Sequence, residues 1–292
     1  MKERVVRVRG DGQLLDTLLT HFPHIGRNKV KAWLTRGQVK VDQQTVQRYD
    51  HPVRAGQQIQ VEMGKAGGEL SIHAKQRLSI VYEDDEVVVV DKPAGLLSVA
   101  TEDKTELTAY RLVTEHVRKM DTKHRIFVVH RLDRDTSGIM LFAKRYETQQ
   151  WLQDNWNDVV KERRYVAVVE GRVQKQEGVI DTWLKESSTR TMYVSSPGDG
   201  LRAITHFRVL KRSSEYSLVE CQLDTGRKNQ IRVHMKSIGH CVVGDKRYGA
   251  TRDEIGRLAL HAASLAFLHP TKPEKVLRFE SEIPAAFRKL FS

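Results

Sequence analysis

Short runs of β-branched and aromatic residues dominate the chain beyond residue 77, and such residues favour strands. Five runs precede residue 170, at 80–82, 87–90, 126–129, 139–142 and 165–169. Helical stretches lie between them at 107–119 and 147–156. Strands interrupted by helices predict a large mixed sheet with helices packed on it, which is an α+β fold.

The N-terminal part of the chain, up to about residue 63, has a different pattern of apolar residues. Apolar residues at helical spacing between positions 14 and 22 predict one short helix, which Pro23 ends. Residues 28–36 predict a second helix with Gly37 as its cap, and alternating valines and isoleucines between 39 and 61 predict short strands. A glycine-rich stretch at 64–68 follows. We therefore expect a small α+β domain at 1–63, a linker at 64–77 and a large domain at 78–292.

Charge points to a polyanionic partner. The 292 residues have a formal net charge of +12, and residues 1–62 hold 11 Lys and Arg against 6 Asp and Glu. Basic side chains that neutralise phosphates release counterions and gain affinity, so nucleic acid is the expected partner class.

Other sequence features narrow the class of protein. No apolar stretch approaches the length that spans a bilayer, and the first residues do not resemble a signal peptide. Cys221 and Cys241 are the only cysteines, which excludes a disulfide framework and gives no zinc-binding spacing. We expect a cytoplasmic protein with no membrane segment and no metal site.

One nine-residue string stands out at 130–138. It reads His-Arg-Leu-Asp-Arg-Asp-Thr-Ser-Gly and leads into an apolar run. Asp133 lies between Arg131 and Arg134, at a loop-to-strand junction where a carboxylate can meet a ligand. A surface salt-bridge cluster is the alternative reading of the same residues.

The string resembles the signature of the RluA-type RNA pseudouridine synthases, His-Arg-Leu-Asp-x-x-Thr-Ser-Gly. The resemblance implies that Asp133 is the catalytic aspartate and that Arg131 helps to hold a base out of its helix. Asp135 occupies a variable position and has no implied role. Segments at 82–96, 161–171, 225–235 and 257–270 match the same family in order, although residues 97–100 lack a Val-His-Pro run that many relatives have. The implied fold is a mostly antiparallel sheet with flanking helices.

Two of these segments imply further site residues. Tyr165 corresponds to a tyrosine whose ring packs on the target base, and ordinary sheet packing is the alternative. Arg232 corresponds to the arginine that pairs with the aspartate, with Arg227 as the competing assignment. Arginine suits this task because its planar group holds a carboxylate through two hydrogen bonds. We expect Arg227, Lys228 and Gln230 to contact the substrate.

The front domain resembles an S-four-type RNA-binding module, named for a ribosomal protein. The likeness rests on residues 27–41, and it departs from the usual pattern at Asp42-Gln43-Gln44 and Gly56-Gln57. The expected RNA-binding residues are Arg27, Lys29, Lys31, Arg36 and Lys40. A merely solvated helix face is the alternative reading.

The resemblance implies an enzyme that isomerises uridine to pseudouridine in RNA without a cofactor. An aspartate with an ordinary pKa of about 3.9 is charged at neutral pH and can act as the nucleophile. The resemblance leaves both the sugar and the base ring as points of attack. Ribosomal RNA is favoured over transfer RNA, and a monomer is the default expectation. The rival classes are an RNA-binding protein without activity and an RNA hydrolase.

Overall fold

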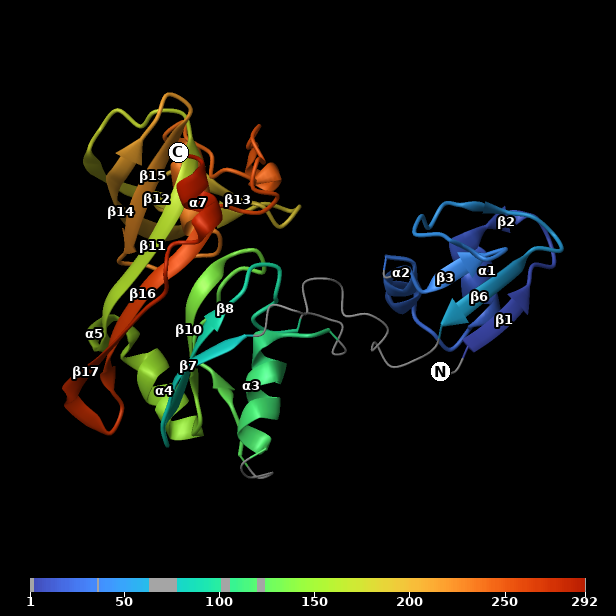
Figure 1. Ribbon diagram of the computed structural model, residues 1–292, viewed down its shortest axis with the longest axis horizontal. Coiled ribbons are helices and arrows are strands. Elements are labelled where there is room, and N and C mark those ends of the chain that lie inside the picture. Colours follow the sequence, from blue (N-terminus) through green and yellow to red (C-terminus); the bar gives the residue numbers. More distant parts are fainter. Residues whose placement is uncertain (1–2, 36, 63–77, 101–105, 120–123, 292) are drawn as a thin grey trace. The chain divides into compact units, whose positions relative to one another are not determined.

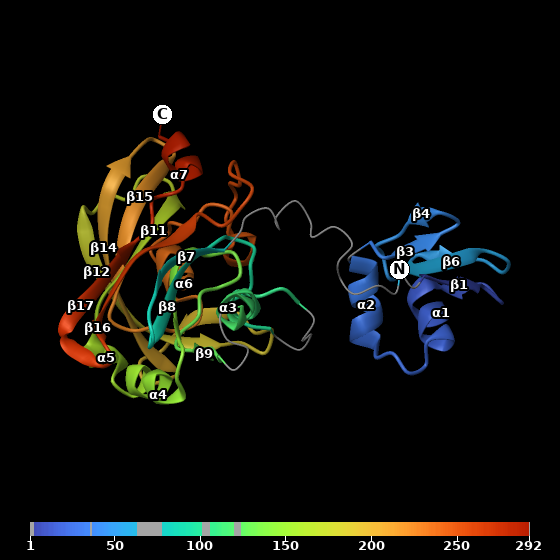
Figure 2. The same cartoon turned by 60° about the horizontal axis from the view of Figure 1, so that its bottom comes forward.

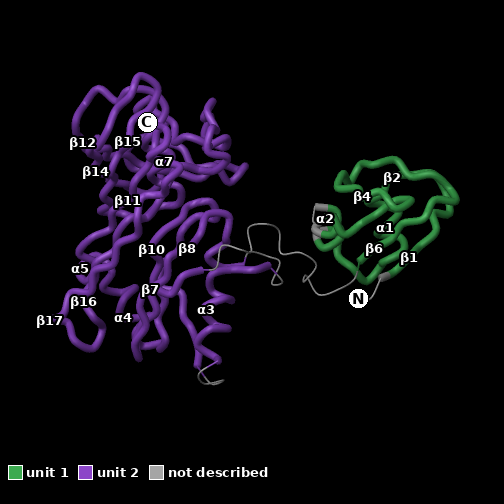
Figure 3. The backbone as a smooth tube through the Cα atoms, in the orientation of Figure 1, with its two compact units in different colours: residues 1–75, 102–105 green, residues 76–101, 106–292 purple. Residues whose placement is uncertain are grey.

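The computed structural model describes residues 3–35, 37–62, 78–100, 106–119 and 124–291. Arg36 and the expected linker at 64–77 lie outside the described residues. The chain divides into two compact units, the first within residues 1–75 and the second formed mainly by residues 106–292 (Figure 3). Each unit has its own hydrophobic core and is described by itself below.

Unit 1 packs two helices on a small sheet. The helices are α1 (Leu14–His21) and α2 (Arg27–Thr35), and both lie on one face of the sheet (Figure 2). The sheet has the order β1-β6-β3-β4, and β2 pairs with β5. The strands are β1 (Glu3–Arg7), β2 (Gly12–Gln13), β3 (Val39–Val41), β4 (Gln44–Thr45), β5 (Pro52–Val53) and β6 (Gln58–Glu62). The sequence pattern missed β1, which reads Glu-Arg-Val-Val-Arg and pairs antiparallel with β6.

The turn between β3 and β4 accommodates an unusual sequence. Asp42 and Gln43 both have positive φ angles, +47° and +70°, which a two-residue hairpin turn of this type requires. Asn and Gly adopt this conformation most readily, so Asp-Gln here is less favourable locally. The Asp42 carboxylate accepts hydrogen bonds from the Gln58 backbone and the Gln57 amide, which stabilise the turn.

Unit 2 is built on an 11-stranded sheet of order β13-β12-β14-β15-β11-β16-β10-β8-β7, with β17 beside β16 and β9 beside β10 (Figure 1). Among the described strand pairs of unit 2, β10 and β16 run parallel and the others run antiparallel. The strands are β7 (Ser79–Glu83), β8 (Val87–Lys92), β9 (Phe127–Val128), β10 (Ser137–Ala143), β11 (Val160–Glu170), β12 (Glu177–Glu186), β13 (Met192–Ser195), β14 (Leu201–Arg212), β15 (Tyr216–Leu223), β16 (Leu260–His269) and β17 (Lys272–Glu280). The expected α+β fold with a large, mostly antiparallel sheet is therefore confirmed.

Helices cover both faces of one end of this sheet. Residues 87–90 of β8 are fully buried, and alternate residues face two different core clusters. One cluster includes Val113 and Val117 of α3 (Ala109–Arg118), and the other includes Leu152 of α4 (Tyr146–Asp154). This two-sided burial explains the unbroken valine run, because a strand covered on both faces has no polar side. The other α-helices of this unit are α5 (Trp156–Val159), α6 (Gln230–Ser237) and α7 (Ala285–Lys289).

Strand β16 brings two distant segments together. It lies between β10 and β11, and its Ala262 is the register partner of both Gly138 and Tyr165. Gly138 has a φ of +114°, and a Cβ there would lie 2.1 Å from the Ala262 carbonyl oxygen. Glycine is therefore required for the close approach of β10 and β16. The loop before β10 consequently lies at the level of Tyr165 on β11.

Candidate active site

Asp133 lies in the loop that joins β9 to β10, and its two neighbours are fixed by a second loop. The buried Ser98 hydroxyl donates to the Leu132 carbonyl (2.7 Å) and accepts from the Leu132 amide (3.1 Å). The Arg134 carbonyl accepts from the Gly95 amide (2.9 Å) and from Lys92 Nζ (3.1 Å). The backbone on both sides of Asp133 is therefore held, while its side chain remains one-third exposed.

Lys92 is fully buried at the base of this second loop. Its ammonium group donates to the carbonyls of Pro93, Leu96 and Arg134. Burial lowers the pKa of Lys92 to about 7. The negative charge of Asp135 acts to raise this pKa, and the positive charge of Arg257 acts to lower it. Three carbonyl partners match the three donors of an ammonium group, so this lysine stabilises the loop that supports Asp133. The sequence suggests only a Pro-x-Gly turn here.

Arg232, near the start of α6, connects Asp133 to the protein interior. Its Nη1 donates to Asp133 Oδ2 (3.2 Å), and its Nε and Nη2 bind the two carboxylate oxygens of Asp245, each at 2.7 Å. The Asn229 side chain accepts from the same Nη1 (3.1 Å), and the Tyr248 ring lies 4.9 Å from the guanidinium carbon. Arg232 is thus fixed by Asp245 and presents its remaining edge to Asp133.

These contacts determine the charge state of Arg232. Burial on its own would lower the pKa of Arg232, but hydrogen bonds and charge from Asp245, together with Asp133, raise it above its usual value. The guanidinium therefore remains a cation beside Asp133. The side chain of Asp245 is 1% exposed and serves as the interior counterion.

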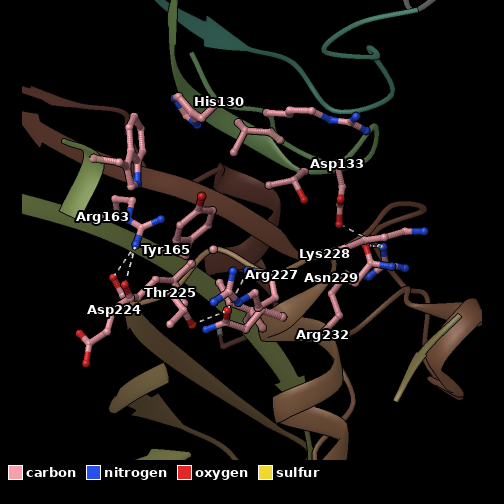
Figure 4. A pocket seen from close by; sticks show the side chains of 18 of the residues that line it. His130, Asp133, Arg163, Tyr165, Asp224, Thr225, Arg227, Lys228, Asn229 and Arg232 are labelled. Atoms are coloured by element: carbon pink, nitrogen blue, oxygen red, sulfur yellow. Dashed lines mark hydrogen bonds and ion pairs between the residues drawn. The ribbon is translucent and has the colours of Figure 1, made fainter. Parts of the chain in front are cut away.

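Tyr165 extends from β11 into the same cleft. In the view of Figure 4 its ring lies between Arg163 and Asp133. Burial raises the pKa of the Tyr165 hydroxyl, as does the negative charge of Asp133, while Arg163 acts in the opposite direction. The hydroxyl has no hydrogen-bond partner within the described part of the chain, so it is available to a ligand.

The three residues line an open cleft of about 880 Å³. Its wall includes loop residues 129–133, the end of α4 and start of α5, the segment 223–232, and Arg163 and Tyr165 of β11 (Figure 4). The volume suits a nucleotide, since ligand pockets typically have about 300–1,000 Å³. Asp133, Tyr165 and Arg232, predicted separately from the sequence, therefore belong to one cleft.

The other predicted cleft residues differ in what they offer to a ligand. Arg131 is exposed, and its guanidinium has no hydrogen bond or ion pair among the described residues. Arg227 donates to the Arg202 carbonyl and not to Asp133, and the Lys228 ammonium pairs with Glu186. Of the two arginines weighed for Asp133, it is Arg232 that makes the ion pair.

The hydrogen bonds of Gln230 argue against the expectation that its side chain binds the substrate. Its amide oxygen accepts from the Thr225 hydroxyl and the Arg227 amide, and its amide nitrogen donates to Ile204 and Thr205. All its donors and acceptors are therefore used within the protein, and its side chain is 3% exposed. Gln230 shapes the segment that precedes α6 and has no group left for the substrate.

The basic residues of unit 1 are on its surface. Arg27, Lys29 and Lys31 of α2 are exposed, whereas Val30, Trp33 and Leu34 of the same helix are buried. Lys40, on β3, forms an ion pair with Glu62 (3.2 Å) and is half-buried. The helix is therefore amphipathic with a basic outer face, which is a prerequisite for the expected RNA contact.

Several site residues were not found from the sequence. Asp245 and Tyr248 lie in a Gly-Asp-Lys-Arg-Tyr-Gly string at 244–249, whose glycines were the available signal. His130 also lines the cleft; burial lowers its pKa to about 3, and its Nε2 accepts from the Leu141 amide (3.0 Å). His130 is therefore held neutral, and its Nε2 fixes the backbone of β10 at Leu141.

The described residues contain neither a metal-binding cluster nor a membrane-spanning helix. No group of three or more His, Cys, Asp or Glu side chains within the described ranges is arranged to hold a metal ion. Among the described helices, none combines the length and the apolar character that a membrane crossing needs.

Comparison with known proteins identifies the family of the chain. The sequence model of the family described as RNA pseudouridylate synthase matches residues 86–237. The RNA pseudouridine synthase YhcT of Bacillus subtilis, itself uncharacterized, is 31% identical over 99% of this chain and 95% of its own length. A ribosomal large subunit pseudouridine synthase D of Xanthomonas campestris is 32% identical over 100% of this chain and 92% of its own.

Solved structures show the same fold. Human RNA pseudouridylate synthase domain containing 4 matches with a TM-score of 0.60 and 23% identity, over 72% of this chain and 90% of that one. The human domain containing 1 protein matches with a TM-score of 0.57 and 24% identity, over 72% of this chain and 88% of that one.

The family model and the sequence relatives identify the chain as an RNA pseudouridine synthase, an enzyme that acts by isomerisation. The chain belongs to the RluA-type family of RNA pseudouridine synthases, as the string at 130–138 indicates.

Proposed function

We propose that this enzyme isomerises uridine in structured ribosomal RNA, with Asp133 as its nucleophile. The observation that supports this most directly is the Asp133 carboxylate, one-third exposed in the cleft and hydrogen-bonded to Arg232. A nucleophile must be both accessible and held in place, and this carboxylate is both. The name of the Xanthomonas relative, which refers to the large ribosomal subunit, supports ribosomal RNA over transfer RNA.

The cleft residues have separate parts in the reaction. The bond from ribose C1′ to base N1 breaks, the uracil turns, and a bond from C1′ to C5 forms while the C5 proton leaves and N1 gains one. Asp133 is the nucleophile: its carboxylate forms a transient bond to the sugar or to the base ring, and this bond breaks again before the product leaves. Arg232 holds the carboxylate, and the Tyr165 ring stacks on the uracil. The base must leave its stack to reach these residues, at a cost of a few kcal/mol. The exposed Arg131 helps to hold the base out of the RNA helix.

Unit 1 adds affinity in this proposal. Its amphipathic helix α2 presents Arg27, Lys29 and Lys31 outward, and we assign this face, with Arg36 and Lys40, to the RNA backbone. Contacts of this kind position a protein on RNA without selecting a sequence. Specificity for one uridine then depends on the shape of the RNA around the cleft.

Release of tritium from RNA labelled at uracil C5 tests the assignment. Large-subunit ribosomal RNA and transfer RNA are transcribed with labelled uridine and offered with and without chelator. We expect release from the ribosomal RNA, unchanged by chelator, since no step requires a metal. Release from transfer RNA alone would contradict the proposed target, and binding without any release would favour a protein that only binds RNA.

The first variant is Asp133→Asn. It keeps the size of the side chain but removes its charge, so we expect no measurable release and an RNA affinity close to that of the unchanged protein. Asp135→Asn is the matched control, because Asp135 pairs with Arg134 at the surface and has no contact with Arg232. Retained activity in Asp133→Asn would refute Asp133 as the nucleophile.

A further inference from the structure

Arg163 lies beside Tyr165 in the cleft, yet the reaction described above gives it no part. It precedes Tyr165 by two positions on β11, and both side chains line the cleft (Figure 4). Residues two apart on a strand point to the same side and are separated by about 6.6 Å. The guanidinium of Arg163 and the ring of Tyr165 are therefore neighbours on one wall.

One nitrogen of the Arg163 guanidinium is fixed by neutral groups. Its Nη2 donates to the carbonyl oxygens of Leu223 (3.1 Å) and Asp224 (3.2 Å). The carboxylate of Asp224 pairs instead with His206 at 2.8 Å. The Trp156 ring, whose centroid lies 5.6 Å from the guanidinium carbon, restrains the orientation further.

The other two nitrogens of this guanidinium have no partner within the described part of the chain. Nε and Nη1 of Arg163 have no hydrogen bond or ion pair to any residue that the structure describes. Gly226 lies beside Nη1, and a Cβ at this position would lie 3.0 Å from it. Because glycine has no side chain, Nη1 is left uncovered on that side. Burial lowers the pKa of Arg163, which reflects the cost of holding a cation here without a contacting carboxylate.

Two other arginines of this enzyme, unlike Arg163, form ion pairs with carboxylates. Arg232 contacts the carboxylates of Asp245 and Asp133. Arg164 is adjacent to Arg163 on β11 and contacts three carboxylates, those of Glu162, Glu220 and Glu280. A half-buried cation that lacks such partners among the described residues and lines an open cleft is a site for an anion from outside.

We propose that Arg163 binds a backbone phosphate of RNA next to the uridine that stacks on Tyr165. The free Nη1 of Arg163 can donate to one phosphate oxygen, and the guanidinium supplies the positive charge that attracts the phosphate. The spacing along β11 is comparable with the distance from a nucleobase to the phosphates that flank it. This proposal rests on the proposed function, because it takes the ligand of the cleft to be RNA.

The test measures binding and does not depend on knowing the natural target. The probe is a short single-stranded RNA of adenosines with one uridine, and fluorescence anisotropy gives its affinity over a series of salt concentrations. We expect Arg163→Gln to bind about tenfold more weakly, with the salt dependence reduced by about one released ion. Arg164→Gln is the matched control on the same strand and is expected to bind as the unchanged protein does.

A neutral methylphosphonate beside the uridine identifies the contact. It should weaken binding to the unchanged protein by a similar factor, and it should have no further effect on Arg163→Gln, since the same contact is already lost. Equal affinities of Arg163→Gln and Arg164→Gln would overturn the assignment. So would competition by inorganic phosphate that depends on Arg163 while RNA affinity does not.

A second variant covers the case in which Arg163→Gln does not fold, as judged from its melting temperature. Arg163→Met keeps an unbranched side chain beside Trp156 but removes the positive charge, and we expect about a tenfold loss of RNA affinity. An unchanged affinity would contradict the assignment.

Failure of this inference differs from failure of the proposed function. If the unchanged protein forms pseudouridine but Arg163→Gln binds normally, only the phosphate site is wrong. If no pseudouridine forms but Arg163→Gln binds weakly, the phosphate site stands and the proposed function fails.

Discussion

At the scale of single residues, the cleft separates groups that the protein satisfies from groups that it leaves open. Gln230 uses its amide oxygen and nitrogen within the fold, and His130 uses its Nε2. Asp133 keeps a third of its side chain exposed in the cleft. Buried polar groups are normally paired, so open ones in a cleft mark where a ligand binds.

Replacement of Tyr165 by Phe and by Leu separates the ring from its hydroxyl. Phe keeps the aromatic face, so we expect its KM to stay within about twofold, since stacking needs no hydroxyl. Leu loses the stacking, which typically contributes about 1–3 kcal/mol per base, so kcat/KM should fall about 10- to 100-fold. Steady-state tritium release measures both. Full activity of the Leu variant would show that the ring does not stack on the base.

At the scale of elements, the loop at 92–98 holds the loop that contains Asp133 in position. Residues 92–98 have no direct contact with the substrate in the proposed reaction, yet they bind the backbone of Leu132 and Arg134 on either side of Asp133. The sequence left this loop without a role, because it lacks the run that many relatives have there. Tertiary contacts between segments about 35 residues apart give it one.

Ser98→Ala tests this support. It removes both hydrogen bonds to Leu132 inside the protein, and an unpaired buried group costs about 1–3 kcal/mol. We expect kcat to fall about tenfold with KM little changed, since Asp133 is misplaced while the RNA-binding surface is intact. Ser196→Ala, at an exposed position, is the control and should be fully active. A lower melting temperature with unchanged kcat would mean that Ser98 serves stability alone.

The junction of β12, β14 and α6 predicts an acid sensitivity. His234 is fully buried between the hydroxyls of Thr182 and Thr205, and burial lowers its pKa to about 4 from 6.5. Between these values the unfolded chain holds more protons than the folded one, so stability falls as the pH falls from about 6.5 to 4. Over this interval the free energy of unfolding should drop by on the order of 1.4 kcal/mol for each step of one in pH.

Denaturant unfolding at several pH values measures this effect. His234→Gln keeps hydrogen-bonding groups but cannot titrate, so its stability should depend less steeply on pH over the same range. His24→Gln, at an exposed position, should keep the slope of the unchanged protein. A slope in His234→Gln as steep as in that control would show that His234 does not titrate differently in the two states.

At the scale of the whole molecule, charge and chemistry are divided between two units. The cleft with Asp133 belongs to unit 2, whereas the basic face of α2 belongs to unit 1. A net charge of +12 favours association with any RNA, and salt weakens it. The division predicts that binding and catalysis can be altered separately.

Replacing Arg27, Lys29 and Lys31 together by Gln tests this separation. We expect a weaker RNA affinity, a salt dependence lower by up to about three ions, and a raised KM with unchanged kcat, because the cleft is not touched. The control replaces Lys175, Lys272 and Lys275, which are exposed on unit 2, so that both proteins lose the same charge. Equal losses in the two proteins would show that net charge, and not the α2 face, determines affinity.

Much of the fold was predictable from local patterns. Helical spacing predicted α1 and α2, and β-rich runs predicted β7, β8, β10 and β11. These predictions were possible because burial of one or two faces gives each segment a characteristic spacing of apolar residues. The pattern missed β1 and made no prediction for β12 to β17, whose register depends on distant partners.

The sequence by itself determined the family, the position of Asp133 and the class of chemistry, because the string at 130–138 and its companion segments are local. The tertiary structure alone decided which groups meet. It paired Asp133 with Arg232, placed Asp245 behind that arginine, gave Ser98 a role and removed one from Gln230. It also left Arg163 without a carboxylate among the described residues, while Arg164, its neighbour in sequence, has three. Which partner a charged side chain finds depends on strand order and register, and these are set by packing across the whole sheet.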